Sequence, residues 1–386
     1  MTGNGNGPDT GHEMTTTEAS VMRKRNRVTI RDVAAAAGVS HQTVSRVLND
    51  RPDVADETRT RIWQTIEEMN YQPSAIARTL TQQRSLTLGI VTAGLKYVGP
   101  SRTLNGISKQ AEVLGYTLLL KELPSFQANS VQPLLNSLLA RRVDGILWAV
   151  PEVGDNRDWL EEQLSGLAVP MICITMEARP GVSTVAIDNY AGGRMATEHL
   201  LQQGRRQIAH VSGPLDWWEA RRRQAGWRDA LLAAGVPASQ LHAEEGTWSS
   251  ASGERAIGRL LASYPEMDAV FAGNDQMALS ILQVACRRGI RVPDELAVVG
   301  FDGLSEAAHY WPPLTTVYQD LQLLGSTAVQ ELIRAIDAYR LRPGTFEPCT
   351  MLLRPELIVR ESSVARKGET DHVPQSEIAA ASIEVD

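Results

Sequence analysis

The 386-residue sequence predicts a small all-α helix-turn-helix module near the N-terminus, followed by an α/β body with two lobes. Two observations predict this combination. Residues 28–50, VTIRDVAAAAGVSHQTVSRVLND, hold two short helical patterns on either side of a glycine. From residue 85 onward, short β-rich runs alternate with segments long enough for a helix, which is typical of parallel sheets with flanking helices.

Small and capping residues define the first two helices. Thr29 is expected to cap the first helix and Ser40 the second, because both side chains can accept a hydrogen bond from a free backbone N–H. Gly38 tolerates the left-handed turn between them. The residues expected to face inward are Val33, Ala34 and Ala37 in the first helix, and Val44, Val47 and Leu48 in the second.

The outward face of the second helix is polar. It is expected to present His41, Gln42, Ser45, Arg46 and Asn49. Amides, hydroxyls and a guanidinium are suited to base edges and phosphates. Two helices joined by a glycine turn at this spacing predict a helix-turn-helix whose second helix enters the major groove. A small helical packing unit is the alternative.

A third helix and a short segment complete the N-terminal module. The third helix is expected to start at a cap-like Asp56 and to end at Met69, with Ile62 and Ile66 in its core. After Pro73-Ser74 comes SAIARTL, which is too short to form a stable helix alone. An interdomain linker is one interpretation of this segment.

The body is read from its strand pattern. Two lobes side by side, each built on a parallel sheet, would leave a cleft at the carboxyl ends of their strands. The expected strands are at 86–92, 116–120, 144–150, 169–175, 207–213, 268–275 and 296–302, with helices around 189–203, 217–234, 252–262 and 275–288.

Polar residues follow several of these strands. Arg223, Asn274 and Asp302 would converge on the cleft and offer hydrogen bonds to hydroxyl groups, while Trp248 can stack on a sugar face. Other interpretations stay open. Residues such as Asn and Asp directly after a strand are commonly helix caps, Arg221–Arg223 can form a solvated helix face, and Trp217 and Trp218 can form either a lid or edge packing.

The stretches TIRDVAAAAGVSHQTVSRVLN and VADETRTRIWQTIEEMNYQPSAIARTL resemble the LacI/GalR family of bacterial transcription repressors, and the resemblance extends over about residues 28–361. It implies a periplasmic-binding-protein-like body with two non-contiguous lobes. The implied divisions are a disordered extension at 1–26, a helix-turn-helix domain at 27–73, a hinge helix at 74–84, a body at 85–361 with crossovers near 175, 318 and 348, and a disordered tail at 362–386.

The resemblance also implies site residues. In the hinge, Leu80 would insert into the minor groove between base pairs. Such an insertion unstacks a base step and kinks the duplex, and the kinked duplex makes more contacts with the protein. The implied DNA-binding residues are Thr29, Ser40, His41, Gln42, Thr43, Ser45, Arg46, Asn49, Tyr71, Ala77 and Leu80. The implied effector-binding residues are Trp217, Arg223, Trp248, Asn274, Gln276, Asp302 and Gln319.

The chain departs from the family pattern in its pocket walls and its C-terminus. Five wall residues of the family pattern are replaced here, by Ala149, Val153, Cys173, Trp217 and Glu219. The identity of the sugar is therefore undecided, and the candidates are a galactoside or another disaccharide. Residues 362–386 lack the Leu heptad that a tetramerising tail requires. A homodimer is therefore expected, matching the two-fold symmetry of a pseudo-palindromic operator.

Charge and missing motifs narrow the function further. Residues 21–84 carry a net charge of +4 within an overall charge of −7, which leaves −11 on the rest, so a polyanion would meet the N-terminal module. The three cysteines are widely separated, no run is apolar enough to span a membrane, and no catalytic, phosphate-binding or metal-binding motif occurs.

We therefore expect a non-enzymatic, cytoplasmic, nucleoid-associated repressor of carbohydrate-utilisation genes, without cofactor or metal. Its expected partners are double-stranded operator DNA, a small carbohydrate effector and a second copy of the chain. The alternative is a cytoplasmic sugar-binding protein or sugar enzyme with a vestigial DNA-binding module.

Overall fold

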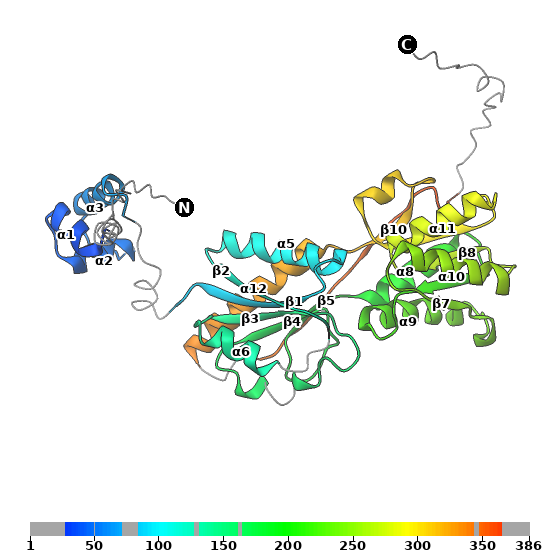
Figure 1. The fold of residues 1–386 in the computed structure, drawn as a ribbon, viewed down its shortest axis with the longest axis horizontal. Coiled ribbons are helices and arrows are strands. Elements are labelled where there is room, and N and C mark those ends of the chain that lie inside the picture. The colour runs from blue at the N-terminus through cyan, green and yellow to red at the C-terminus, as the bar shows by residue number, and fades with distance from the viewer. Residues whose placement is uncertain are drawn as a thin grey trace, which may run out of the picture. The chain divides into compact units, whose positions relative to one another are not determined.

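The computed structural model describes residues 28–49, 51–71, 84–126, 131–160, 164–342 and 347–364. These fall into two compact units, Met1–Ser85 and Leu86–Asp386 (Figure 1). Within the described residues, no helix combines the length and the apolar character needed to cross a membrane.

The described part of the first unit contains α1 (Ile30–Ala37), α2 (His41–Leu48) and α3 (Asp56–Glu68). Thr29 caps α1 through a reciprocal pair of hydrogen bonds with Asp32. Gly38 has a left-handed φ of 67°, and the Ser40 hydroxyl accepts the Thr43 N–H to cap α2. These cap and turn predictions are confirmed.

The expected cap of α3 is wrong. Asp56 is the first helical residue, and Ala55 precedes it without a side-chain cap. An acidic side chain in the first turn still favours this end of the helix, because it faces the positive end of the helix dipole. The buried core of the unit contains Val33, Ala34, Ala37, Val44, Val47, Val54, Ile62, Ile66 and Tyr71, with Leu48 and Met69 packed against it.

The second unit contains two sheets, one in each lobe (Figure 1). The first sheet has the order β11-β5-β4-β3-β1-β2, and its pairs are parallel. Its strands are β1 (Thr87–Ala93), β2 (Thr117–Leu123), β3 (Gly145–Ala149), β4 (Met171–Ile174), β5 (Thr184–Ile187) and β11 (Thr350–Leu353).

The second sheet has the order β12-β10-β9-β8-β6-β7, in which only the β10–β12 pair is antiparallel. Its strands are β6 (Ile208–Ser212), β7 (Ala243–Glu245), β8 (Ala269–Ala272), β9 (Ala297–Asp302), β10 (Thr315–Tyr318) and β12 (Glu356–Ile358). The two-lobed α/β architecture expected from the sequence is present.

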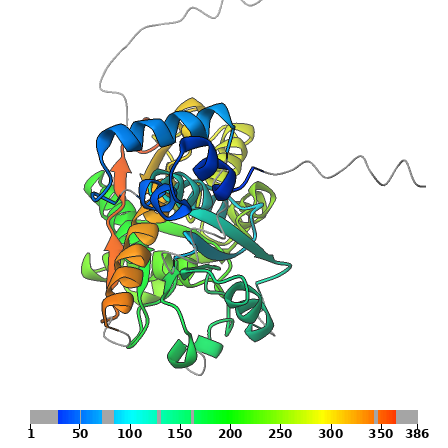
Figure 2. The same cartoon turned by 90° about the vertical axis from the view of Figure 1, so that its left-hand side faces the viewer.

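Helices cover both faces of each sheet, because successive side chains of a strand point to opposite sides. In the first lobe, α5 and α12 cover one face of the sheet and α6 covers the other (Figures 1 and 2). Leu88 and Ile90 pack with α5 and α12, whereas Val91 and Ala93 pack with α6. In the second lobe, one core lies against α8 and α9, and the other against α10 and α11. The helices are α5 (Val98–Val113), α6 (Gln132–Leu139), α8 (Asn189–Gln202), α9 (Trp218–Ala233), α10 (Ser250–Ser263), α11 (Asp275–Arg287) and α12 (Leu321–Leu341).

The chain passes between the lobes at positions that correct two expectations. The first crossing is not near residue 175, because β5 still pairs with β4 in the first sheet. It comes at Asp188, which caps α8. The return passage lies between Tyr318 and Leu321, and the last lies between Leu353 and Glu356 rather than near 348.

The expected start of the tail at residue 362 is also wrong. Ser362 and Ser363 are buried in the second lobe. The Ser362 hydroxyl donates to the Val298 carbonyl at 2.6 Å and accepts the Thr315 N–H at 2.8 Å. Ser363 hydrogen-bonds Nε2 of the buried His199 at 2.7 Å. The ordered body therefore includes these two serines, whose polarity made them look like the start of a solvated tail.

Candidate functional site

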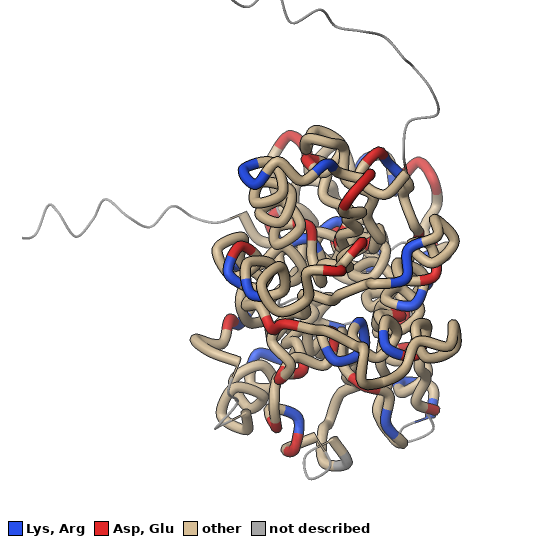
Figure 3. The backbone as a smooth tube through the Cα atoms, turned by 90° about the vertical axis from the view of Figure 1, so that its right-hand side faces the viewer, with Lys and Arg blue, Asp and Glu red and all other residues tan. Residues whose placement is uncertain are grey.

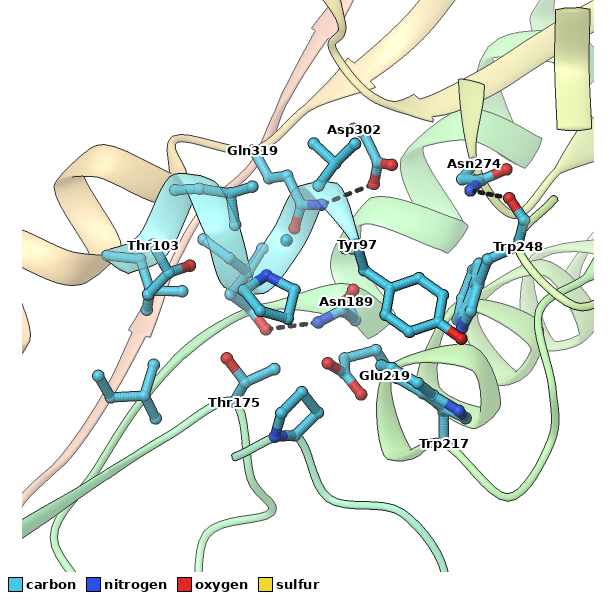
Figure 4. Close-up of a pocket in the computed structure, with 18 of the residues that line it drawn as sticks. Tyr97, Thr103, Thr175, Asn189, Trp217, Glu219, Trp248, Asn274, Asp302 and Gln319 are labelled. Atoms are coloured by element: carbon cyan, nitrogen blue, oxygen red, sulfur yellow. Dashed lines mark hydrogen bonds between the residues drawn. The ribbon is translucent and has the colours of Figure 1, made fainter. Parts of the chain in front are cut away.

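A pocket lies at the carboxyl ends of strands from both sheets (Figure 4). The empty space among its lining residues is about 810 Å³ when the open solvent at its mouth is counted. Its lining residues are Tyr97, Val98, Gly99, Pro100, Thr103, Ala149, Pro151, Ile174, Thr175, Ile187, Asn189, Trp217, Glu219, Arg223, Trp248, Asn274, Gln276, Asp302, Gln319, Leu321 and Leu324.

Asp302 and Arg223 form a buried polar centre on one side of this pocket. The Asp302 Oδ1 accepts a hydrogen bond from Nε2 of Gln319 at 2.7 Å and lies 3.4 Å from Nη1 of Arg223. Arg223 also donates to the Asn189 Oδ1 at 2.8 Å and to the Gly273 carbonyl at 2.6 Å. The guanidinium is thus held in one orientation by three groups from different elements.

Burial sets the electrostatics of this centre. It raises the pKa of Asp302, and the charge of Arg223 and the hydrogen bond from Gln319 act in the opposite direction. Burial also lowers the pKa of Arg223, against the attraction of Asp302 and Glu219. A fixed carboxylate and guanidinium together provide acceptors and donors for neighbouring hydroxyl groups.

Trp248 forms an aromatic wall that the surrounding backbone holds in place. The ring lies so close to Gly213 that any side chain there would collide with it. The Arg223 guanidinium lies 5.3 Å from the centre of the ring. Asn274 donates its side-chain N–H to the Trp248 carbonyl at 2.9 Å and accepts the Met277 N–H at 2.9 Å. Asn274 is thus the helix cap of α11 and a support for Trp248.

Three of the described non-glycine residues with a positive φ line the pocket, and the other three, Asn70, Leu86 and Arg142, lie elsewhere. Thr175, Trp248 and Asp302 have φ values of 61°, 65° and 110°, in a region that side chains other than Gly rarely adopt. Such strain persists only where surrounding contacts enforce it, and it occurs often at binding sites. These three residues line the pocket, so part of the backbone strain lies where the polar groups converge.

Trp217 connects the two lobes across the mouth of the pocket. Its ring packs edge-on against Tyr97 and Phe126 of the first lobe, with centroid distances of 5.5 and 4.8 Å. It therefore lines the pocket and packs at its edge, so both interpretations of Trp217 hold. Trp218 is buried but is not a lining residue, so of the two interpretations it fits packing rather than a lid.

The structure brings all seven predicted effector residues to this one pocket. Sequence reasoning missed Tyr97, Thr175 and Asn189, which follow β1, β4 and β5. The rule that ligands bind beyond the carboxyl ends of parallel strands would have found the first two. Asn189 was missed because β5 itself was not expected.

A second candidate site is the exposed face of α2. His41, Gln42 and Arg46 are exposed, and the Arg46 guanidinium pairs with Asp53 at 3.3 Å. The other described residues of the predicted set have structural contacts. Thr29, Ser40 and Thr43 belong to the two helix caps, Asn49 donates its side-chain N–H to the Ser45 carbonyl at 2.7 Å, and Tyr71 lies in the core.

Ala77 and Leu80 lie outside the described residues, as does the predicted hinge helix. Figure 3 looks onto the second lobe, where positions of Lys and Arg alternate with positions of Asp and Glu along the described backbone.

The described residues contain no group of His, Cys, Asp or Glu arranged to hold a metal ion.

Comparisons with known proteins match both units of the chain. Residues 29–74 match the family described as bacterial regulatory proteins, lacI family, and residues 197–363 match a periplasmic binding protein-like domain. The lactose operon repressor of Escherichia coli K12 is 32% identical over 343 residues, covering 89% of this chain and 92% of the relative.

Two solved structures extend the likeness. The lac repressor dimer bound to operator and the anti-inducer ONPF superposes with a TM-score of 0.76 at 32% identity, covering 88% of this chain and 99% of that chain. The transcriptional regulator CelR–cellobiose complex gives a TM-score of 0.62 at 34% identity, covering 87% and 100%. From its N-terminal helices to its two-lobed body, the chain belongs to the lacI family of bacterial regulatory proteins.

Proposed function

We propose that this protein is a sequence-specific transcriptional repressor of carbohydrate-utilisation genes, which binds a pseudo-palindromic operator as a dimer and is controlled by a small sugar. The observation that carries the proposal is the presence, in one chain, of a helix-turn-helix with an exposed polar α2 and a body with a pocket between convergent strand ends. The lac repressor relative is a dimer bound to operator, which supports the same assembly here.

The polar groups of the pocket favour a neutral carbohydrate. Asp302 and Arg223 are largely satisfied by each other and by Gln319 and Asn189. An anionic ligand would disturb this charge balance, and a purely apolar ligand would exclude water from these polar groups without offering hydrogen bonds in return, which is costly. Trp248 supplies a flat surface for the apolar face of a sugar. CelR is described in complex with cellobiose, so a disaccharide is the first ligand to test.

The two sites communicate through the body in this proposal. A sugar in the pocket touches both lobes, so its binding shifts the population of lobe arrangements. That shift changes operator affinity, and by linkage the operator changes sugar affinity by the same factor. We place the protein in the cytoplasm, where its operator lies, and assign it no catalytic residue and no cofactor. The other site proposals are Gln42 and Arg46 at base edges and Leu80 as the minor-groove wedge.

Nuclease protection tests the proposal. Full-length protein is mixed with genomic fragments, and the protected site is mapped with and without cellobiose, lactose, methyl β-galactoside or xylobiose. A symmetric protected site that one sugar alters supports the proposal. Equal protection along all fragments, with no preferred site, would contradict the repressor assignment. Sedimentation should give a species near twice the chain mass of 42.2 kDa, and a stable tetramer would contradict the assembly.

A further inference from the structure

Glu219 is a pocket residue outside the predicted effector set. It is the second residue of α9, and its side chain lines the pocket while remaining only 8% exposed. Figure 4 shows its carboxylate pointing into the pocket near Thr175, on the opposite side of this view from Asp302 and Gln319. Its Oε2 has no hydrogen-bond partner among the described residues. A buried, unpartnered carboxylate oxygen aimed into a pocket requires an explanation.

The neighbouring cations are already engaged elsewhere. Arg221 pairs with Glu152 at 3.5 Å and donates to two backbone carbonyls. Arg223 directs Nε and Nη1 to Asn189, Gly273 and Asp302. Neither arginine has a recorded hydrogen bond to Glu219, although both lie close enough to affect it. The carboxylate therefore faces the pocket without a cation of its own.

Trp248 presents the complementary feature. Its Nε1–H is a buried donor without an acceptor among the described residues, and its ring lines the same pocket. Among the buried side-chain atoms of the described lining residues, one acceptor and one donor therefore lack a partner. A hydroxyl group can donate one hydrogen bond and accept others, so a hydroxyl-rich ligand can satisfy both. An ammonium group could satisfy only the acceptor.

We propose that Glu219 is a specificity-determining residue that accepts a hydrogen bond from a hydroxyl group of a neutral carbohydrate, opposite the contacts made by Asp302. The ligand class is therefore a neutral sugar that presents hydroxyl groups on both sides of the pocket. This inference depends on the sugar pocket of the proposed function and extends it by adding a ligand contact.

The contact makes effector affinity depend on pH. Burial raises the pKa of Glu219 to about 7, and the charge of Glu152 acts in the same direction, while its own backbone N–H, Arg223 and Arg221 oppose the shift. The ionised carboxylate is a stronger acceptor for the sugar hydroxyl than the protonated acid, which retains only its neutral carbonyl acceptor. Protons therefore compete with the sugar, and affinity falls by up to about tenfold per pH unit below this pKa.

Calorimetric titration of the full-length protein tests the inference. Cellobiose is titrated at pH 8 and at pH 6 into the wild type, Glu219→Gln and Asp229→Asn. Asp229 is a matched control on the same helix because it is a carboxylate outside the pocket lining. We expect Glu219→Gln to bind about tenfold to hundredfold more weakly at pH 8 and to lose the pH dependence, while Asp229→Asn behaves like the wild type.

Each contrary result has a distinct meaning. Equal affinity of wild type and Glu219→Gln, with the same pH profile, overturns the contact but leaves the sugar-controlled repressor intact. Tighter binding of glucosamine than of cellobiose by the wild type overturns the neutral ligand class. Absence of heat from every sugar in the wild type overturns the sugar effector itself, and the contact with it. The wild-type pH profile serves as the test if Glu219→Gln does not fold.

Discussion

Arg221 of α9 in the second lobe places its Nη2 3.5 Å from Oε1 of Glu152, a fully buried carboxylate that follows β3 in the first lobe. The other Glu152 contacts come from the first lobe: Arg157 at 2.6 Å, Arg179 at 3.3 Å and the Glu177 N–H at 3.0 Å. The backbone joins the lobes at the same place, since the Trp218 N–H donates to the Glu152 carbonyl at 3.0 Å. One buried charge thus links both lobes at the rim of the pocket.

Replacing Arg221 should weaken the lobe arrangement in which Arg221 contacts Glu152. The Arg221 side chain is 39% exposed, so its ion pair contributes only about 0.5–1 kcal/mol. Because Glu152 keeps two other arginines, Arg221→Gln should fold normally and bind the sugar about two- to fivefold more weakly. Calorimetry measures this change. Arg222→Gln is the control, since Arg222 stacks over Tyr190 instead. A loss as large in the control would exclude a specific interlobe contact.

The exposed face of α2 should read DNA sequence. Gln42→Ala or Arg46→Ala is expected to cost about 1–3 kcal/mol of binding free energy at the operator and much less on random DNA. Fluorescence anisotropy on both duplexes measures the difference. Asp53→Asn is the control for Arg46, because it removes the 3.3 Å ion pair but leaves the guanidinium. Equal weakening on both duplexes would make these side chains phosphate contacts.

Sequence reasoning predicted the fold well where a side-chain pattern has one structural solution. The caps at Thr29 and Ser40 and the glycine turn at Gly38 follow from local chemistry, which the first unit obeys. Arg223, Asn274 and Asp302 were expected together because parallel strands direct their following residues to one edge of a sheet, whereas Gln319 was expected only from the family resemblance.

The predictions that were wrong or undecided also have physical causes. The four residues of β5 are fully buried yet too few to show a period, so the first crossing was expected before this strand instead of after it. Trp217 and Trp218 are adjacent in sequence, and only the fold reveals that one lines the pocket while the other does not. Asn274 carried two interpretations, and its hydrogen bonds to Met277 and Trp248 show the capping role.

The corrected C-terminal boundary predicts the effect of truncation. Deletion of residues 365–386 should leave the stability of the body unchanged. Deletion of residues 362–386 should lower the free energy of unfolding by about 3 kcal/mol or more, because Ser362 and Ser363 supply several buried hydrogen bonds to β9, β10 and His199. Urea unfolding followed by tryptophan fluorescence compares the two truncations. Equal stability of both would mean that these serines contribute nothing measurable.

Asp302 should be essential for the response to sugar and dispensable for operator binding without sugar. Asp302→Asn keeps the shape of the side chain and suits the φ of 110°, because Asn tolerates positive φ better than most residues. It removes the charge that holds Arg223 and faces the ligand. Losing a charged hydrogen-bonding partner in a buried pocket costs about 1.5–3 kcal/mol, so sugar affinity should fall about tenfold to hundredfold.

Operator binding by Asp302→Asn is measured by anisotropy with and without the sugar that the wild type recognises. Unchanged affinity without sugar, together with loss of the sugar response, is the expected pair of results. Arg223→Ala should show the same pair, because Arg223 and Asp302 act as one unit at 3.4 Å. A response to a nucleobase or an amino acid, with none to any sugar, would show that these two residues recognise a different ligand class. If Asp302→Asn kept the full sugar response, Asp302 would be a structural partner of Arg223 and Gln319 rather than a ligand contact.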